Sequence, residues 1–252
     1  MVLIGGNGSL SLAHMYGEIY SGLQLVCIPK TIDLDVPKTD RTIGFDTAVQ
    51  QLVSYCDQLL LTARSHHRWF VVQAMGRDCG QLALHAGIAI AADAILIPEI
   101  KFDVDNLVKH IKQSKRDYGI IMVAEGISIR GHSGKPAEMV ARKLTAAGIP
   151  NRTAFPEYTQ RAGDTVASDR ILAAGFADTA LKAIENNETN VMTVIQNGEY
   201  KTISLDEFFA AGRQQKDPHI TGAMTSNAYV EPDNVLLQIA IDMGIYMGEK
   251  RK

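Results

Sequence analysis

The sequence has few cysteines, no long apolar run and no excess of positive charge. Its 252 residues carry a formal net charge of −3 and include three cysteines, Cys27, Cys56 and Cys79. Because these cysteines are far apart and form no CxxC pair, we expect them to be reduced and structural, as in a cytoplasmic protein. A slightly negative chain has no overall attraction for nucleic acid, so we expect no such partner. Any contact with phosphate must then come from local sites.

Membrane and secretion signals are also missing from the sequence. No apolar run approaches the ~20 residues that a membrane helix needs, and the first residues lack the basic segment and apolar stretch of a signal peptide. We therefore expect a cytoplasmic protein with no membrane partner. Apolar residues make up 46% and charged residues 21% of the chain, as in ordinary globular proteins. The length suffices for one large α/β domain or two smaller ones.

Short apolar runs alternate with helical patterns along most of the chain. The expected strands are residues 2–4, 23–28, 69–75, 94–97, 119–125 and 152–159. The expected helices are residues 9–20, 44–65, 79–91, 103–117, 136–147 and 165–186. Nearly continuous apolar strands are typical of parallel sheets covered on both faces, so the pattern predicts an α/β fold with doubly wound, Rossmann-like, mostly parallel sheets. Ligands of such sheets bind beyond the carboxyl ends of the strands.

The C-terminal part of the chain is less regular. Residues 191–205 read as a hairpin with an Asn197-Gly198 turn. A last helix is expected over about residues 234–247. No internal repeat or low-complexity tract is visible in the sequence.

A glycine-rich loop, Gly5-Gly6-Asn7-Gly8-Ser9, follows the first expected strand and opens a helix. Glycines allow a phosphate to approach the backbone, and a helix N-terminus supplies free N–H groups and a positive dipole end. The loop has no Lys-Ser or Lys-Thr pair and is therefore no P-loop. Ser11 stands where a GxGxxG motif has its third glycine. By itself the spacing is equally compatible with a tight turn.

The second loop, PKTIDLDVPKTD (29–40), combines opposed charges at the end of an apolar strand. A carboxylate in this place can act as a base or hold a metal. Two carboxylates two residues apart in an extended segment point to opposite sides, so we expect Asp33 and Asp35 to have different roles. Lys30 could meet a phosphate as a point charge. The competing interpretation is a solvated, turn-rich loop.

Three more polar loops follow expected strands. They are MGRDCG (75–80), AEG (124–126) and YTQRAGD (158–164). Each is compatible with a surface turn. Five such loops at five strand ends nevertheless indicate a binding site.

Together these loops resemble the phosphofructokinases. The first loop is also similar to those of NAD kinases and some lipid kinases. The stretch PKTIDLD followed by TDRTIGFDTA is similar to the catalytic loop of the phosphofructokinases and the helix after it. MGRDCG, AEG and YTQRAGDTVASDR then follow in the family's order, and the similarity extends from residue 1 to about residue 185. The resemblance implies a glycolytic phosphoryl transfer from ATP or pyrophosphate to the 1-hydroxyl of fructose 6-phosphate. It also implies Mg²⁺ as cofactor and a homodimer or homotetramer.

The resemblance implies a role for each matching residue. Asp33 would take the proton from the sugar's 1-hydroxyl, Thr31 would bind the reacting end, and Arg77 would stabilise charge on the phosphoryl group. The donor-binding residues would be Gly6, Gly8, Ser9 and Lys30. The magnesium ligands would be Asn7 and Asp35. The sugar-binding residues would be Met75, Gly76, Glu125, Tyr158 and Arg161, joined by Arg68 and Arg152, which match arginines that the family lends to a neighbouring subunit's 6-phosphate.

The sequence departs from the family pattern in several places. Asn7 stands where aspartate is usual, Leu34 where asparagine is usual, and Tyr158 where histidine is frequent. The chain also lacks roughly the first hundred residues of the family pattern, which form much of one domain's sheet. If nothing replaces them, we expect an exposed sheet edge and exposed apolar faces.

The resemblance predicts two domains. A phosphoryl-donor and catalytic-loop domain, incomplete, would hold residues 1–44 plus 161–213. A sugar-phosphate-binding domain would hold residues 45–160 plus 214–252. Gly8 is typical of ATP users, whereas Lys30 is typical of pyrophosphate users and of a subgroup of ATP users, so the pair favours ATP.

Two alternatives remain open at this point. Asn7 and the missing segment favour a non-catalytic, sugar-phosphate-binding member of the family, whereas the intact Asp33 and Arg77 favour an enzyme. The interpretation as a dinucleotide-dependent dehydrogenase is supported by the glycine loop alone. His66 and His67 read as a polar helix end, and His14 and His85 receive no role.

Overall fold

The structure is a computed structural model that describes residues 1–20, 22–127, 134–214, 230–231 and 233–248. The chain folds as two compact units. Unit 1 comprises Met1–Thr47 and Asp164–Ala228, and unit 2 comprises Ala48–Gly163 and Tyr229–Lys252. The assignment of a donor domain and a sugar domain to the expected residue ranges stays a prediction.

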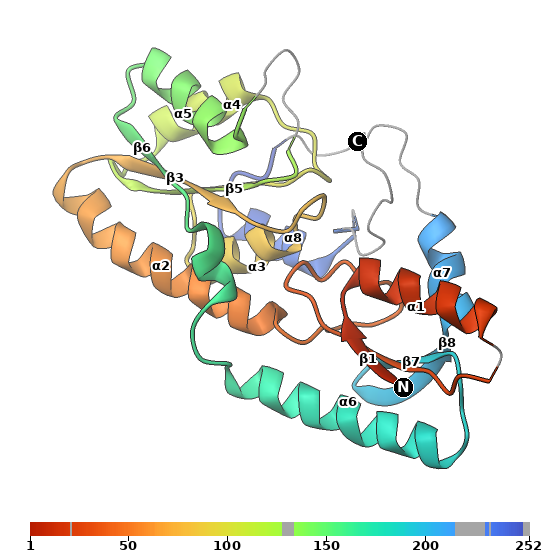
Figure 1. Cartoon of the computed structure of the whole chain (residues 1–252). Helices are drawn as coiled ribbons and strands as arrows, with labels where there is room; N and C mark the ends of the chain where they lie inside the picture. The colour runs from red at the N-terminus through yellow and green to blue at the C-terminus, as the bar shows by residue number, and fades with distance from the viewer. Residues whose placement is uncertain (21, 128–133, 215–229, 232, 249–252) are drawn as a thin grey trace. The chain divides into compact units, whose positions relative to one another are not determined.

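Unit 1 contains a four-stranded sheet (Figure 1). The order of its strands is β1 (Val2–Gly5), β2 (Val26–Pro29), β7 (Val191–Gln196) and β8 (Glu199–Ser204). The pairs β1–β2 and β2–β7 are parallel, and β7–β8 is an antiparallel hairpin. Asn197 and Gly198 form the hairpin turn with φ of 53° and 83°, the left-handed conformations that a type I′ turn requires. The expected Asn-Gly hairpin is therefore confirmed.

Helices cover both faces of the unit 1 sheet (Figure 1). The helices are α1 (Asn7–Ile19) and α7 (Leu205–Gln214) on one face and α6 (Ala167–Glu185) on the other. Cys27 of β2 packs on the α1 and α7 side with Leu10 and Phe208, whereas its neighbours Val26 and Ile28 pack on the α6 side. Since successive side chains of a strand point to opposite faces, a strand buried on both sides must be apolar throughout.

Unit 2 contains a second four-stranded sheet, and all its pairs are parallel. The order of the strands is β4 (Ala94–Leu96), β5 (Gly119–Ala124), β3 (Trp69–Ala74) and β6 (Asn151–Ala154). The chain enters this unit along α2 (Phe45–Ser65). The helices α4 (Val104–Gln113) and α5 (Pro136–Ala146) lie over one face, and α3 (Gln81–Ala89) and α8 (Val235–Asp242) over the other (Figure 1). The predicted α/β class with mostly parallel sheets is confirmed.

Two expected elements are clearly shorter in the structure, and one helix was not expected. The strand expected over 152–159 ends at Ala154, because Pro156 cannot donate to a ladder and the chain continues into the 3-10 helix η1 (Glu157–Arg161). The last helix is shorter than 234–247, beginning after the N-cap Asn234 and ending at Asp242. Helix α7 was not predicted at all.

The three cysteines are buried, and no disulfide joins them within the described residues. Burial raises the pKa of both Cys27 and Cys56 to about 12. Their thiols therefore stay protonated and unreactive at neutral pH, which is typical of structural cysteines. Within the described residues, no helix is both long and apolar enough to span a membrane.

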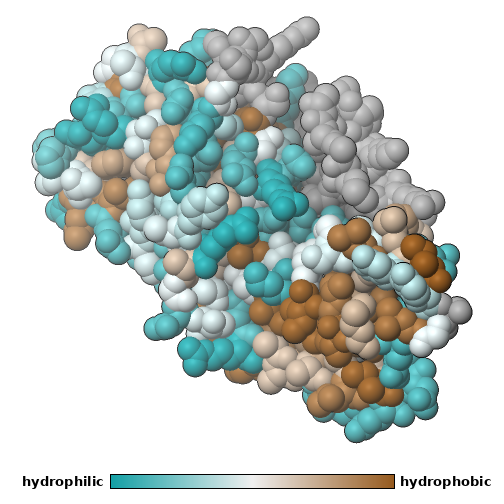
Figure 2. Space-filling model, in the orientation of Figure 1, coloured by the Kyte–Doolittle hydropathy of each residue, from teal (hydrophilic) through white to brown (hydrophobic). Residues whose placement is uncertain are grey.

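Unit 1 carries exposed apolar side chains on its edge strand and first helix, shown as brown atoms in Figure 2. Among the described strands, β1 pairs with β2 alone and is therefore an edge. Six side chains are 45–66% exposed: Val2, Ile4, Leu12, Met15, Tyr16 and Ile19. The expected exposed edge and apolar face are thus present. Contiguous apolar surface of this kind is typical of a protein contact.

Candidate functional site

The acidic loop after β2 in unit 1 is folded on itself. The Thr31 hydroxyl accepts a hydrogen bond from the Asp33 N–H at 3.1 Å, and the Thr42 hydroxyl donates to the Thr31 carbonyl at 2.8 Å. Asp33 and Asp35 are each only 4% exposed. Burying a carboxylate is unfavourable unless polar groups compensate it, so two buried aspartates in one loop indicate a functional role more than a solvated turn.

The expected extended geometry between Asp33 and Asp35 is wrong. Leu34 between them has a φ of 53°, in the left-handed region. A left-handed residue breaks the alternation of an extended strand, so strand geometry does not place the two carboxylates on opposite sides of the loop. Asparagine tolerates this conformation better than leucine, because its short polar side chain can bond locally to the backbone. This gives a physical reason why asparagine is usual at position 34 in the family that the sequence resembles.

Asp40, the third aspartate of the loop, has a structural role. Its carboxylate accepts a hydrogen bond from the Asn197 N–H at 2.7 Å, and its own N–H donates to the Ile195 carbonyl at 2.8 Å. Asp40 therefore ties the acidic loop to the β7–β8 hairpin. Of the three aspartates, Asp33 and Asp35 remain candidates for chemistry.

The glycine loop lies directly beside the acidic loop in unit 1. The Lys30 N–H donates to the Gly5 carbonyl at 2.8 Å. A Cβ atom added to Gly6 would lie 3.3 Å from the Thr31 Cβ and 3.4 Å from the Lys30 carbonyl oxygen. Glycine at position 6 therefore permits this close approach. The structure thus brings together the expected donor-binding loop and the expected catalytic loop.

The start of α1 suits an anion. The helix begins at Asn7, earlier than expected, so Asn7, Gly8 and Ser9 form its first turn. Gly6 at the N-cap has no side chain to cap the first N–H groups, and this turn contains no acidic residue. Free N–H groups and the positive end of the helix dipole together favour a phosphate.

In unit 2, the loop Met75–Gly80 is held by side-chain oxygens. Glu125 Oε1 accepts hydrogen bonds from the Gly76 N–H at 3.0 Å and the Arg77 N–H at 2.8 Å. Gln160 Oε1 accepts from the Met75 N–H at 2.9 Å. These bonds fix the backbone of the loop that carries Arg77, which is itself exposed.

A fourth bond at this loop comes from Glu99, whose Oε1 accepts from the Gly80 N–H at 2.8 Å and the Val230 N–H at 3.3 Å. Burial raises the pKa of Glu99, although these N–H groups act in the opposite direction. Sequence reasoning missed Glu99 and Gln160. Glu99 does carry the signal used for Asp33 and Glu125, since it closely follows a buried strand, β4.

Two glycines near this loop cannot carry a side chain. Gly76 has a φ of 133°, and a Cβ there would lie 2.6 Å from the Cys79 carbonyl oxygen. A Cβ on Gly126 would lie 2.2 Å from the Arg77 carbonyl oxygen. Arg77 itself has a left-handed φ of 52°. Such conformations store strain and are concentrated at functional sites.

The helix η1 joins this group through Gln160, which is 1% exposed. Tyr158 is 77% exposed on the same helix, and Arg161 is exposed at its end. Because Gln160 bonds to Met75, η1 lies beside the loop. The structure therefore groups Met75, Gly76, Arg77, Glu125, Tyr158 and Arg161 near the carboxyl ends of β3, β5 and β6.

Arg68 and Arg152 lie at the other end of these strands. Arg68 precedes β3, and Arg152 pairs with Phe70, the second residue of β3. Met75 follows the last residue of the same strand. At about 3.3 Å per residue, roughly 15 to 25 Å separate these arginines from Met75. The structure does not bring them to the sugar-binding group of their own chain.

We expect Gln160→Leu to destabilise the chain by about 1–3 kcal/mol, because it leaves the Met75 N–H without its acceptor. Urea unfolding followed by circular dichroism measures this change. The exposed Gln50, which bonds Ser54 at 3.2 Å on α2, provides the control Gln50→Leu, with an expected change below about 0.5 kcal/mol. Equal effects of the two substitutions would contradict the positioning role of Gln160.

In each unit, glycine loops and buried or strand-end carboxylates gather at the carboxyl ends of parallel strands, where α/β proteins of this class bind their ligands. Comparison with known families agrees with this class and makes it specific. A family model described as Phosphofructokinase matches residues 1–184. The chain belongs to the phosphofructokinase family.

Individual relatives agree with this assignment. The chain is 35% identical over 271 residues to the ATP-dependent 6-phosphofructokinase of Trichormus variabilis, covering 99% of this chain and 71% of the relative. The structure of phosphofructokinase from Saccharomyces cerevisiae matches with a TM-score of 0.78 and 28% identity, over 96% of this chain and 34% of the yeast chain. A pyrophosphate-dependent phosphofructokinase from Marinobacter aquaeolei shares the fold, with a TM-score of 0.76 at 22% identity. The chain therefore spans about a third of the yeast chain's length.

Proposed function

We propose that this chain is a 6-phosphofructokinase, which transfers a phosphoryl group from ATP to the 1-hydroxyl of fructose 6-phosphate. The observation that carries the proposal is the pair of buried aspartates in the loop that packs against the glycine loop of α1. A phosphate-binding helix start next to a buried carboxylate supplies the two elements that phosphoryl transfer needs, namely an anion cradle and a base. The Trichormus variabilis relative, at 35% identity, is named as ATP-dependent, which supports ATP over pyrophosphate as the donor.

The proposed chemistry uses residues of unit 1. Asp33 accepts the proton of the sugar's 1-hydroxyl while that oxygen forms a bond to the terminal phosphorus of the donor. The bond from this phosphorus to the bridging oxygen breaks, and ADP leaves with its electron pair. Thr31 contacts the reacting end. The first-turn N–H groups of α1 and Lys30 bind the donor phosphates.

The sugar phosphate is proposed to bind to unit 2. Glu125 Oε1 already accepts two backbone N–H groups, so Oε2 is the oxygen proposed for the fructose hydroxyls. Arg161 and Tyr158 on η1 would bind the 6-phosphate, with Tyr158 as a neutral hydrogen-bond donor. Arg77 would stabilise negative charge on the phosphoryl group during its transfer.

Magnesium fits the donor types that unit 1 offers. Asp35 supplies a buried carboxylate and Asn7 an amide oxygen, and Mg²⁺ prefers oxygen ligands. The amide is the weaker of the two, so Asp35 would carry most of the binding. When bound, the ion would neutralise charge on the donor phosphates.

A second copy of the chain is proposed to complete the sugar site. Arg68 and Arg152 lie at the strand ends opposite Met75, which supports a role toward a neighbouring subunit's 6-phosphate. This predicts a homodimer or homotetramer. A cytoplasmic location also stays a prediction.

The second candidate function is sugar-phosphate binding without turnover, which the weak ligand Asn7 favours. Purified chain should be assayed for fructose 1,6-bisphosphate with ATP and with pyrophosphate in parallel, and titrated with fructose 6-phosphate. Turnover with ATP supports the enzyme. Binding without turnover supports the second candidate. If the chain shows no binding and no turnover, both candidate functions are overturned for this chain alone.

We expect Gly8→Asp to lower kcat/KM for ATP about tenfold or more, because an added carboxylate repels the donor phosphates. Among the described residues nothing lies within 4 Å of a Cβ at position 8, so the substitution fits sterically. Gly8→Ala adds the Cβ without the charge and is the matched control in a steady-state assay. An equal loss in both variants would contradict the electrostatic explanation.

A further inference from the structure

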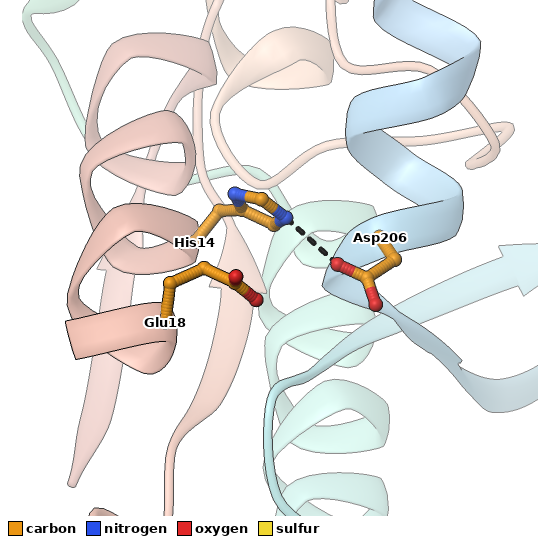
Figure 3. A group of neighbouring side chains, drawn as sticks. All are labelled: His14, Glu18 and Asp206. Carbon is orange, nitrogen blue, oxygen red and sulfur yellow. Dashed lines mark hydrogen bonds and ion pairs between the residues drawn. The ribbon is translucent and has the colours of Figure 1, made fainter. Parts of the chain in front are cut away.

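Three potential metal ligands meet in unit 1, outside the loops assigned to phosphoryl transfer. His14 and Glu18 are four residues apart on α1 and therefore share one face of the helix. Asp206 comes from the first turn of α7 (Figure 3). One potential ligand atom from each of the three residues lies within 4.8 Å of the other two.

The His14 ring is fixed in orientation before any metal binds. It stacks on Phe209 of α7, with ring centroids 4.5 Å apart and an interplanar angle of 3°. Its Nε2 atom lies 2.8 Å from Asp206 Oδ1. Figure 3 shows Nε2 pointing at the Asp206 carboxylate, with the Glu18 carboxylate near the same space.

The two helices that supply the ligands share one buried core. Leu10 and Ala13 of α1 pack in the same apolar cluster as Leu205 and Phe208 of α7. The backbone positions of the ligands are therefore set by packing. The Glu18 side chain is exposed and can change rotamer to close the site.

We propose that His14, Glu18 and Asp206 form a binding site for a first-row divalent transition metal such as Zn²⁺. One imidazole nitrogen with two carboxylate oxygens is a donor set that suits zinc, whereas magnesium prefers oxygen ligands alone. At zinc bond lengths of about 2.1 Å, adjacent ligands of a tetrahedral ion lie about 3.4 Å apart, so His14 Nε2 and Asp206 Oδ1, which are 2.8 Å apart, need only a small side-chain adjustment to admit the ion. Water would fill the remaining positions.

The charge around the site agrees with this assignment. Among the ion pairs of the described residues, neither Glu18 nor Asp206 is joined to a lysine or arginine, and Asp206 pairs with His14. No lysine or arginine of the described residues therefore competes with a metal cation for these two carboxylates. Bound zinc would take the Nε2 lone pair, with the ring proton on Nδ1, and would join α7 to α1.

The test is a zinc titration of the untagged chain, measured by competition with a chromophoric chelator and by thermal unfolding. We expect one site and a rise in Tm with Zn²⁺ that Mg²⁺ does not produce. Glu18→Gln, an isosteric change at an exposed position, should weaken zinc binding about tenfold or more, and His14→Gln and Asp206→Asn likewise.

The chain offers a matched control for the His–carboxylate pair. His67 Nδ1 lies 2.7 Å from Asp117 Oδ2, both side chains are exposed, and the described residues place no third ligand beside them. His67→Gln should leave zinc affinity unchanged. Equal zinc affinity in wild type and Glu18→Gln, or a loss in His67→Gln that matches the loss in His14→Gln, would overturn the proposal.

Discussion

Asp33→Asn is expected to lower kcat for phosphoryl transfer at least about a hundredfold, while fructose 6-phosphate binding changes little. Positioned general bases contribute about 10²- to 10⁴-fold, and an amide of the same shape cannot accept the proton. The bond from the Asp33 backbone N–H to the Thr31 hydroxyl is left in place by this substitution. The measurement is steady-state formation of fructose 1,6-bisphosphate with a parallel binding titration.

Asp40→Asn provides the control within the same loop. Within the described part of the chain, the bond that the Asp40 carboxylate makes is to the Asn197 N–H, and an amide oxygen can still accept that bond. The kcat of the Asp40→Asn variant should therefore stay within a few-fold of the wild-type value. Wild-type kcat in Asp33→Asn would contradict the role of Asp33 as base, and so would an equal loss in the two variants. Thermal unfolding of Asp33→Asn shows whether a loss reflects chemistry or a collapsed loop.

The parts of the fold that could be predicted are those with a local cause. Strand β2 reads as a continuous apolar run because Val26 and Ile28 face one layer of helices and Cys27 the other. The hairpin turn could be predicted because Asn197 and Gly198 accept left-handed conformations. The loops at the strand ends followed from the general geometry of parallel sheets.

The parts that could not be predicted depend on contacts between distant residues. Nothing near Gln160 in the sequence indicates that it accepts the Met75 N–H, 85 residues away. The left-handed Leu34 was missed because leucine gives no signal for this conformation. Helix α7 was missed because its apolar residues show their role only when Leu205 and Phe208 pack against Leu10.

The metal-ligating cluster illustrates the same limit. His14 received no role from sequence, since its second carboxylate, Asp206, is 192 residues away. The spacing of His14 and Glu18 on one helix is a local signal, but two ligands at that spacing are common on exposed helices. Only the packing of α7 on α1 completes the group.

Asp169→Asn is expected to destabilise the chain by about 2–4 kcal/mol. Asp169 of α6 is fully buried, and its two oxygens accept three hydrogen bonds at the start of α2. Oδ1 accepts from the Gly44 N–H at 3.0 Å, and Oδ2 accepts from the Thr47 N–H at 2.8 Å and the Thr47 hydroxyl at 2.6 Å. An asparagine would present an NH₂ group to at least one of these donors. Urea unfolding followed by circular dichroism measures the loss.

Asp178→Asn on the same helix is the matched control. Asp178 is exposed and pairs with Lys182 at 2.6 Å one turn away, so its loss should change the free energy of unfolding by less than about 0.5 kcal/mol. Equal effects at Asp169 and Asp178 would contradict the capping role. Asp169 lies in the SDR stretch that is part of the family resemblance, yet its carboxylate accepts hydrogen bonds from residues at the start of α2. A large loss of stability at this position would therefore mean that this part of the family motif stabilises the start of α2.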